Sequence, residues 1–196
     1  MQVLLKVSRL IDAINERIGR LVYWLVLAAV LLSAGNAIIR KLFNMSSNAF
    51  LEAQWYFFSA VFLLCSGYTL LRNEHVRIDV LAGRLSAKAQ TWIDVLGTLF
   101  FLLPMAILLM VLSWPIFVRT FTHNEISTNA GGLILWPARL LVPVGFALLT
   151  AQGLSELIKR IAFLTGAGPD PVTRHDSHAA EKELAEEIKR MAEGRQ

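Results

Sequence analysis

Histidines and nucleophilic side chains most often carry chemistry, and in this sequence they lie outside the apolar segments. A haem-binding membrane bundle needs histidines inside its spans. The four histidines instead lie in polar segments, at His75, His123, His175 and His178. The sequence also contains no nucleophile elbow, phosphate-binding loop or metal-binding helix motif. We therefore expect no enzyme activity and no cofactor in this chain.

Polar side chains within or beside the apolar runs form a second group of candidates. Asn36 and Gln152 lie inside such runs. Ionisable residues near the ends of the runs are Arg40, Glu52, Asp94, Arg139 and Glu156. Hydrocarbon offers no hydrogen bonds to such groups. We therefore expect each of them to have a structural partner or to contact another subunit.

Arg40 and Glu52 are separated by one short polar turn. Arg40 closes the first apolar run and Glu52 opens the second, so a hairpin places both at the same face of the membrane. Two interpretations stay open. The residues form an ion pair with each other, or each reaches separately into the headgroup layer.

The most distinctive polar segment is residues 73–80, after the second apolar run. His75 and Asp79 are four residues apart and share a side in a helix or a strand, and Arg77 lies between them. We expect His75, Arg77 and Asp79 to fix a connector at the cytoplasmic interface by hydrogen bonds and ion pairs. The alternative is an ordinary amphipathic connector.

Long uncharged runs dominate the remaining sequence. Of its 196 residues 55% are hydrophobic and 17% are charged, and the mean hydropathy is +0.52. About 20 apolar residues cross a bilayer as a helix. The runs predict an all-α integral membrane protein with four transmembrane helices, at about 21–43, 50–71, 91–118 and 136–164. This pattern excludes an ordinary soluble domain.

The two ends of the chain differ from the membrane domain. In residues 1–20 apolar side chains recur every three or four positions with charged residues between them, which predicts an N-terminal amphipathic interfacial helix. The alternative is an extension packed on the bundle. Residues 165–196 form a polar tail. The net charge is +4. The basic residues lie at the ends of the apolar runs, which indicates contact with a membrane surface rather than with nucleic acid.

Lysine and arginine residues are more numerous beside the N-terminal segment, the 72–90 loop and the C-terminal side than beside the other two loops. Because cytoplasmic loops carry the excess of positive charge, we expect both termini to be cytoplasmic. Residues 120–135 should then be periplasmic.

Local signals add detail to the spans. Ser86 is a candidate N-cap of the third span, and Pro104 should kink that span. Asn129 to Gly132 predicts a flexible turn. Small residues at intervals of four suggest two helix–helix seams, one of Ala29, Ser33 and Ala37 and one of Ala147, Ala151 and Ser155.

Three short motifs around the four spans carry a family resemblance. Ile39 to Phe43 ends the first span, Glu52 opens the second, and Glu74 to Asp79 follows it. In this order and spacing they resemble the small membrane subunit of tripartite ATP-independent periplasmic (TRAP) transporters, the DctQ-like family, over roughly residues 9–165. Residues 127–133 and the following Trp136-Pro137 resemble the branch associated with mannitol, chloroaromatic and 2-oxo acid uptake. Where the family often has two adjacent acids, Glu52 is followed by Ala53.

The resemblance implies a division of labour in the bacterial inner membrane. A large permease subunit would carry substrate and sodium by an elevator movement, and a periplasmic substrate-binding protein would deliver an organic acid. The present chain would be the small scaffold subunit, and sodium would bind the large partner. The alternatives are a stand-alone small membrane transporter or a membrane anchor subunit of another complex.

Overall fold

The computed structural model describes residues 2–43, 47–72 and 86–166. The elements are α1 (Gln2–Phe43), α2 (Asn48–Leu71), α4 (Ala87–Gly97), the π-helix η1 (Thr98–Leu102), α5 (Leu103–Thr122) and α6 (Trp136–Leu164). Four helical segments are long and apolar enough to cross a membrane: α1, α2, Lys88–Thr122 and α6. The predicted four-span helical membrane fold is therefore confirmed, while the cytoplasmic placement of the termini stays a prediction.

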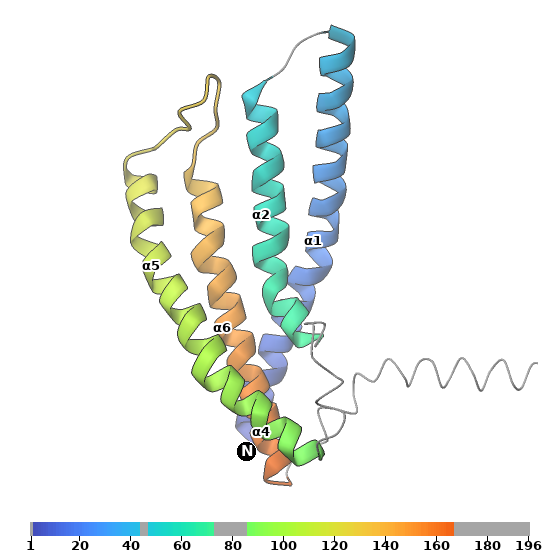
Figure 1. Ribbon diagram of the computed structural model, residues 1–196, viewed down its shortest axis with the longest axis vertical. Coiled ribbons are helices and arrows are strands. Elements are labelled where there is room, and N and C mark those ends of the chain that lie inside the picture. Colours follow the sequence, from blue (N-terminus) through green and yellow to red (C-terminus); the bar gives the residue numbers. More distant parts are fainter. Residues whose placement is uncertain (1, 44–46, 73–85, 167–196) are drawn as a thin grey trace, which may run out of the picture.

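Helix α6 is the central element of the bundle. It packs against α1, α2, α4, η1 and α5, whereas α1 packs mainly on α2 and α6. Figure 1 shows α5, α6, α2 and α1 in this order across the molecule. The N-terminus and α4 lie together at one end (Figure 1), and the loop between α5 and α6 lies at the other. We call these the α4 end and the loop end.

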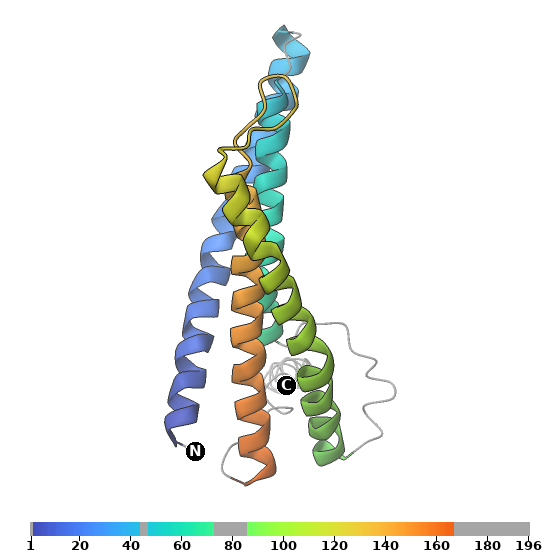
Figure 2. The same ribbon diagram turned by 90° about the vertical axis from the view of Figure 1, so that its left-hand side faces the viewer.

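Helix α1 continues without a break through the predicted boundary at residue 20. Its 42 residues span about 63 Å at 1.5 Å per residue, about twice the thickness of a hydrocarbon core. Figure 2 shows its first half beside α6, and Ser8, Asn15 and Gly19 are buried there. The amphipathic segment is thus an extension packed on the bundle. Its location at a membrane surface stays a prediction.

The third span contains an irregular turn where a proline kink was predicted. Ser86 caps its start as predicted, because the side-chain oxygen accepts from the backbone N–H of Ala89 at 3.4 Å. Pro104 has no N–H and cannot donate to the carbonyl of Phe100. The chain widens into η1 at this point, and the N–H of Leu103 donates to the carbonyl of Thr98, five residues back.

Glycines rather than the predicted small-residue ladders mark the closest helix contacts. A Cβ added at Gly67 would lie 2.4 Å from Oδ1 of Asn15, and one at Gly145 would lie 2.8 Å from Cβ of Leu63. In the first ladder Ser33 and Ala37 are exposed, so the ladder forms no seam within the described chain. Of the second ladder, Ser155 is buried against α1.

Candidate functional site

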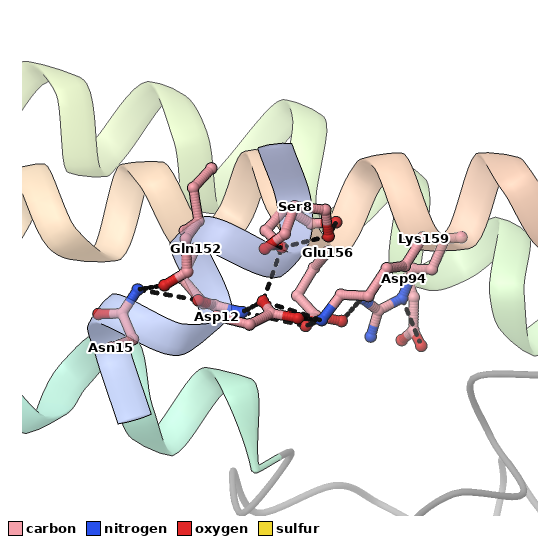
Figure 3. Close-up of polar contacts among 10 residues, drawn as sticks. Ser8, Asp12, Asn15, Asp94, Gln152, Glu156 and Lys159 are labelled. Carbon is pink, nitrogen blue, oxygen red and sulfur yellow. Dashed lines mark hydrogen bonds and ion pairs between the residues drawn. The ribbon is translucent and has the colours of Figure 1, made fainter. Parts of the chain in front are cut away.

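Two complementary polar stripes meet between α1 and α6 at the α4 end. On α1 the stripe consists of Ser8, Asp12 and Asn15, which are spaced for one helix face. On α6 it consists of Gln152, Ser155, Glu156 and Lys159. Figure 3 shows the two sets of side chains pointing toward one another. We call these seven residues, together with Arg160 and Asp94, the polar network.

Gln152 is the centre of the polar network. Its side chain is fully buried, and each of its polar atoms has a partner. Its Oε1 accepts from Nδ2 of Asn15 at 2.8 Å. Its Nε2 donates to Oδ1 of Asp12 at 2.9 Å and to Oε1 of Glu156 at 3.2 Å. This satisfies the expectation that an amide inside an apolar run needs partners.

Asp12 connects the first turns of α1 to three residues of α6. Besides Gln152, its carboxylate accepts from the hydroxyl of Ser155 at 2.7 Å and pairs with Nζ of Lys159 at 3.1 Å. The hydroxyl oxygens of Ser8 and Ser155 lie 2.7 Å apart one turn away. These contacts hold a segment near the N-terminus against one near residue 155.

The network extends to α4 through Arg160, which pairs with Asp94 on α4 and with Glu156 on its own helix. Nη1 of Arg160 lies 2.7 Å from Oε2 of Glu156, and its Nε lies 3.3 Å from Oδ2 of Asp94. Lys159 also contacts the Glu156 carboxylate. The side chains of Arg160 and Glu156 are only 7% and 10% exposed. Such buried charges are tolerated because each one is paired and hydrogen-bonded. Over residues 2–43, 47–72 and 86–166, no group of three or more His, Cys, Asp or Glu side chains could hold a metal ion.

At the loop end, Glu52 binds the loop and not Arg40. Its carboxylate accepts from the hydroxyl of Ser127, from Nδ2 of Asn129 at 2.7 Å and from the backbone N–H of Leu133 at 2.7 Å. Arg40 is exposed, and no salt bridge between it and Glu52 is found in the described chain. Of the two interpretations left open, the ion pair between Arg40 and Glu52 is not formed in the described chain, where donors of the loop occupy the carboxylate.

Arg139 takes part in a second charged group at the loop end. It donates from Nη1 to the hydroxyl of Thr120 and to Oε2 of Glu125 at 2.6 Å. Nε of Arg119 lies 3.3 Å from the other oxygen of Glu125. Desolvation raises the pKa of Glu125, but the hydrogen bonds and positive charges of the two arginines outweigh it. The pKa of this carboxyl therefore lies below its usual value of 4.5.

The other predicted site residues have different outcomes. Asn36 is buried in α1, and its Oδ1 has no hydrogen-bond partner in the described part of the chain. His75, Arg77 and Asp79 lie outside the described residues, so their role stays a prediction. Asp94 and Glu156 were expected to need a partner, and both pair with Arg160, which the sequence analysis had not named.

Sequence reasoning missed Ser8, Asp12 and Asn15 as functional residues. Their spacing of four and three residues places them on one helix face, beside the apolar stripe that the sequence shows. The same spacing links Gln152, Ser155 and Lys159 on α6. Two polar stripes of matching length in one membrane protein are a usable signal that they face each other.

Four apolar helices with internally paired charges at both ends define a multi-pass membrane protein. The family model described as "Tripartite ATP-independent periplasmic transporters, DctQ component" matches residues 29–163, which is more than two thirds of the chain. The chain therefore belongs to the DctQ family and is the small component of a TRAP transporter. No curated protein and no solved structure matches the chain.

Proposed function

We propose that the chain is a static scaffold subunit in the bacterial inner membrane, with both termini in the cytoplasm. It binds and supports a large elevator-type permease subunit, which takes up an organic acid together with sodium. A periplasmic substrate-binding protein delivers that acid. The chain itself catalyses no reaction and holds no sodium.

The polar network is the observation that carries the scaffold role. An elevator works only if one part stays still while another part crosses the bilayer. The ion pair of Arg160 with Asp94 joins α6 to α4, and the hydrogen bonds of Gln152 with Asn15 and Asp12 join α6 to α1. Sliding α6 against α1 or α4 would leave these buried groups without partners, which is costly in a low-dielectric interior.

The outer surface of the bundle supports contact with lipid and with a large membrane partner. Large apolar side chains are exposed along α2, for example Trp55, Phe58 and Phe62. Apolar surface alone does not drive association of helices in lipid. Specific contacts with the permease should therefore involve close packing and a few polar groups on the exposed surface of the bundle.

Reconstitution in proteoliposomes tests this function. The large subunit and the binding protein, taken from the same transport system, are assayed for sodium-driven uptake with and without the chain. The chain is also assayed alone. We expect uptake only from the complete system. Uptake by the chain alone would contradict the scaffold role, and full uptake without it would show that the large subunit needs no such support.

A further inference from the structure

An open hollow lies between the end of α5 and the start of α6, at the loop end. Its volume is about 450 Å³, and it is lined by Pro115, Ile116, Arg119 and Arg139. Two of these residues are apolar and two carry guanidinium groups. The hollow therefore combines a surface for hydrocarbon with a surface for an anion.

The two arginines retain hydrogen-bonding capacity toward the hollow. Glu125 accepts from Nε of Arg119 and from Nη1 of Arg139, and Thr120 accepts from the same Nη1. A guanidinium has five N–H donors in a planar fork, so most donors of each arginine are not used in these bonds. The Arg119 side chain is 75% exposed. Two arginines and one glutamate leave this group with an excess of positive charge, which suits a phosphate.

An apolar track leads from the hollow along α5. Leu108, Leu112 and Ile116 follow one another at intervals of four residues, so they lie on one face of the helix. All three are more than half exposed, and Arg119 lies about one turn beyond Ile116. A chain of methylene groups could lie on this face while its head reaches the arginines.

Aromatic side chains place the hollow at the boundary of the membrane. Trp114, Phe117, Phe121 and Trp136 form a series of neighbouring rings with centroids 5.5 to 5.9 Å apart. Tryptophan is enriched at the level of the lipid headgroups. Both helices that line the hollow contribute to this aromatic series, so the arginines lie near the depth at which a phospholipid carries its phosphate.

We propose that Arg119 and Arg139 bind the phosphate of a phospholipid whose acyl chain lies along Leu108, Leu112 and Ile116. The arginines supply charge-assisted hydrogen bonds, and Glu125 holds the two guanidinium groups in place. The bound lipid fills the hollow between α5 and α6. This site belongs to the chain itself and does not depend on the partners proposed above.

Native mass spectrometry of the full chain in detergent tests the site. The probes are dioleoylphosphatidylglycerol, dioleoylglycerol, which has the same acyl chains but no phosphate, and inorganic phosphate. Wild type is compared with Arg119→Gln. The matched control is Lys41→Gln, which removes another exposed cation at the loop end. Thermal unfolding checks that each variant is folded.

We expect phosphatidylglycerol to bind wild type and Lys41→Gln equally and Arg119→Gln about fivefold more weakly, as loss of charge-assisted hydrogen bonds predicts. Dioleoylglycerol should bind all three weakly. Equal phosphatidylglycerol binding by Arg119→Gln and Lys41→Gln would overturn the proposal. Inorganic phosphate binding as tightly as the lipid would show an anion site without a role for the acyl chain, and would overturn the lipid assignment.

Discussion

The α4 end and the loop end use the same kinds of residues for different purposes. At the α4 end, Glu156 and Arg160 are almost completely buried, and Arg160 joins α6 to Asp94 of α4, which is far away in the sequence. At the loop end, Glu125 is partly exposed and Arg119 is largely exposed, and the charges hold a connection of 13 residues between two neighbouring helices. Burial, and not the number of ion pairs, decides which end fixes the bundle.

Removing one partner of a buried ion pair should have the largest effect. Glu156→Ala leaves Arg160 and Lys159 without their shared carboxylate, and we expect a loss of about 3 kcal/mol in unfolding free energy. Thermal unfolding in detergent measures this. The control is Glu16→Ala, which removes the half-exposed pair with Arg72 at 2.8 Å and should cost less than about 1 kcal/mol. Equal losses would mean that burial does not decide how much an ion pair contributes to stability.

Enlarging Gly67, which Asn15 contacts closely, should have the next largest effect on the free energy of unfolding. In Gly67→Ala a Cβ would lie 2.4 Å from Oδ1 of Asn15 and 3.2 Å from the carbonyl oxygen of Leu148. Either the buried Asn15 side chain moves and loses its hydrogen bond to Gln152, or the helices separate. We expect a loss of about 2 kcal/mol, as for other overpacked contacts. In Gly35→Ala, nothing lies within 4 Å of the added Cβ, and the helix should gain about 0.5 kcal/mol. A neutral Gly67→Ala in the same unfolding assay would show that this contact adjusts freely.

The helices could be predicted from the sequence, because each one is set by a local pattern. The uncharged runs located the second, third and fourth helical segments within a few residues, whereas α1 begins at Gln2, well before the predicted start at about residue 21. Ser86 was identified as a cap because capping involves only neighbouring residues. The π-helix was not predicted, although Pro104 marked the place. A missing N–H can be relieved by a kink or by a wider turn, and only packing selects between them.

At the loop end, removing the Glu52 carboxylate should loosen the loop but change the stability of the bundle little. Glu52→Ala removes the acceptor for Ser127, Asn129 and the N–H of Leu133. We expect faster proteolytic cleavage within residues 123–135 and little change in the unfolding temperature. Arg40→Ala is the control, and it should leave cleavage unchanged because Arg40 does not pair with Glu52 in the described chain. An identical increase in both variants would favour an ion pair between Arg40 and Glu52 after all.

Lowering the pH should produce the smallest effect, through Glu125. Its pKa in the folded chain lies below the usual 4.5, so the charged form is stabilised by folding. This contribution is complete above pH 4.5 and is lost as the pH falls below that value toward the folded-state pKa. Wild type should therefore unfold at a higher temperature than Glu125→Gln at neutral pH, with a difference that narrows below pH 4.5. A constant difference would argue against this titration.

The candidate site was only partly predictable, for reasons visible in individual residues. Gln152, Arg139 and Glu52 were identified because polar groups beside hydrocarbon need partners, but the identity of those partners depends on the fold. Glu52 illustrates this limit. A short hairpin suggested Arg40, whereas the loop that binds its carboxylate is about 80 residues away in the sequence. Asp12 was missed because it lies in a segment rich in charge, where a partly buried carboxylate cannot be told from a surface one.

A disulfide between α1 and α6 tests the central claim most directly. In Cys65→Ser/Ser8→Cys/Ser155→Cys, the two sulfur atoms replace hydroxyl oxygens that lie 2.7 Å apart, within reach of a disulfide bond. Sodium-driven uptake by the reconstituted three-component system is measured before and after oxidation, and then after reduction. If the α1–α6 junction is a static part of a scaffold, oxidation should leave uptake unchanged. Loss of uptake on oxidation, with recovery on reduction, would show that this junction moves during transport and would contradict the account.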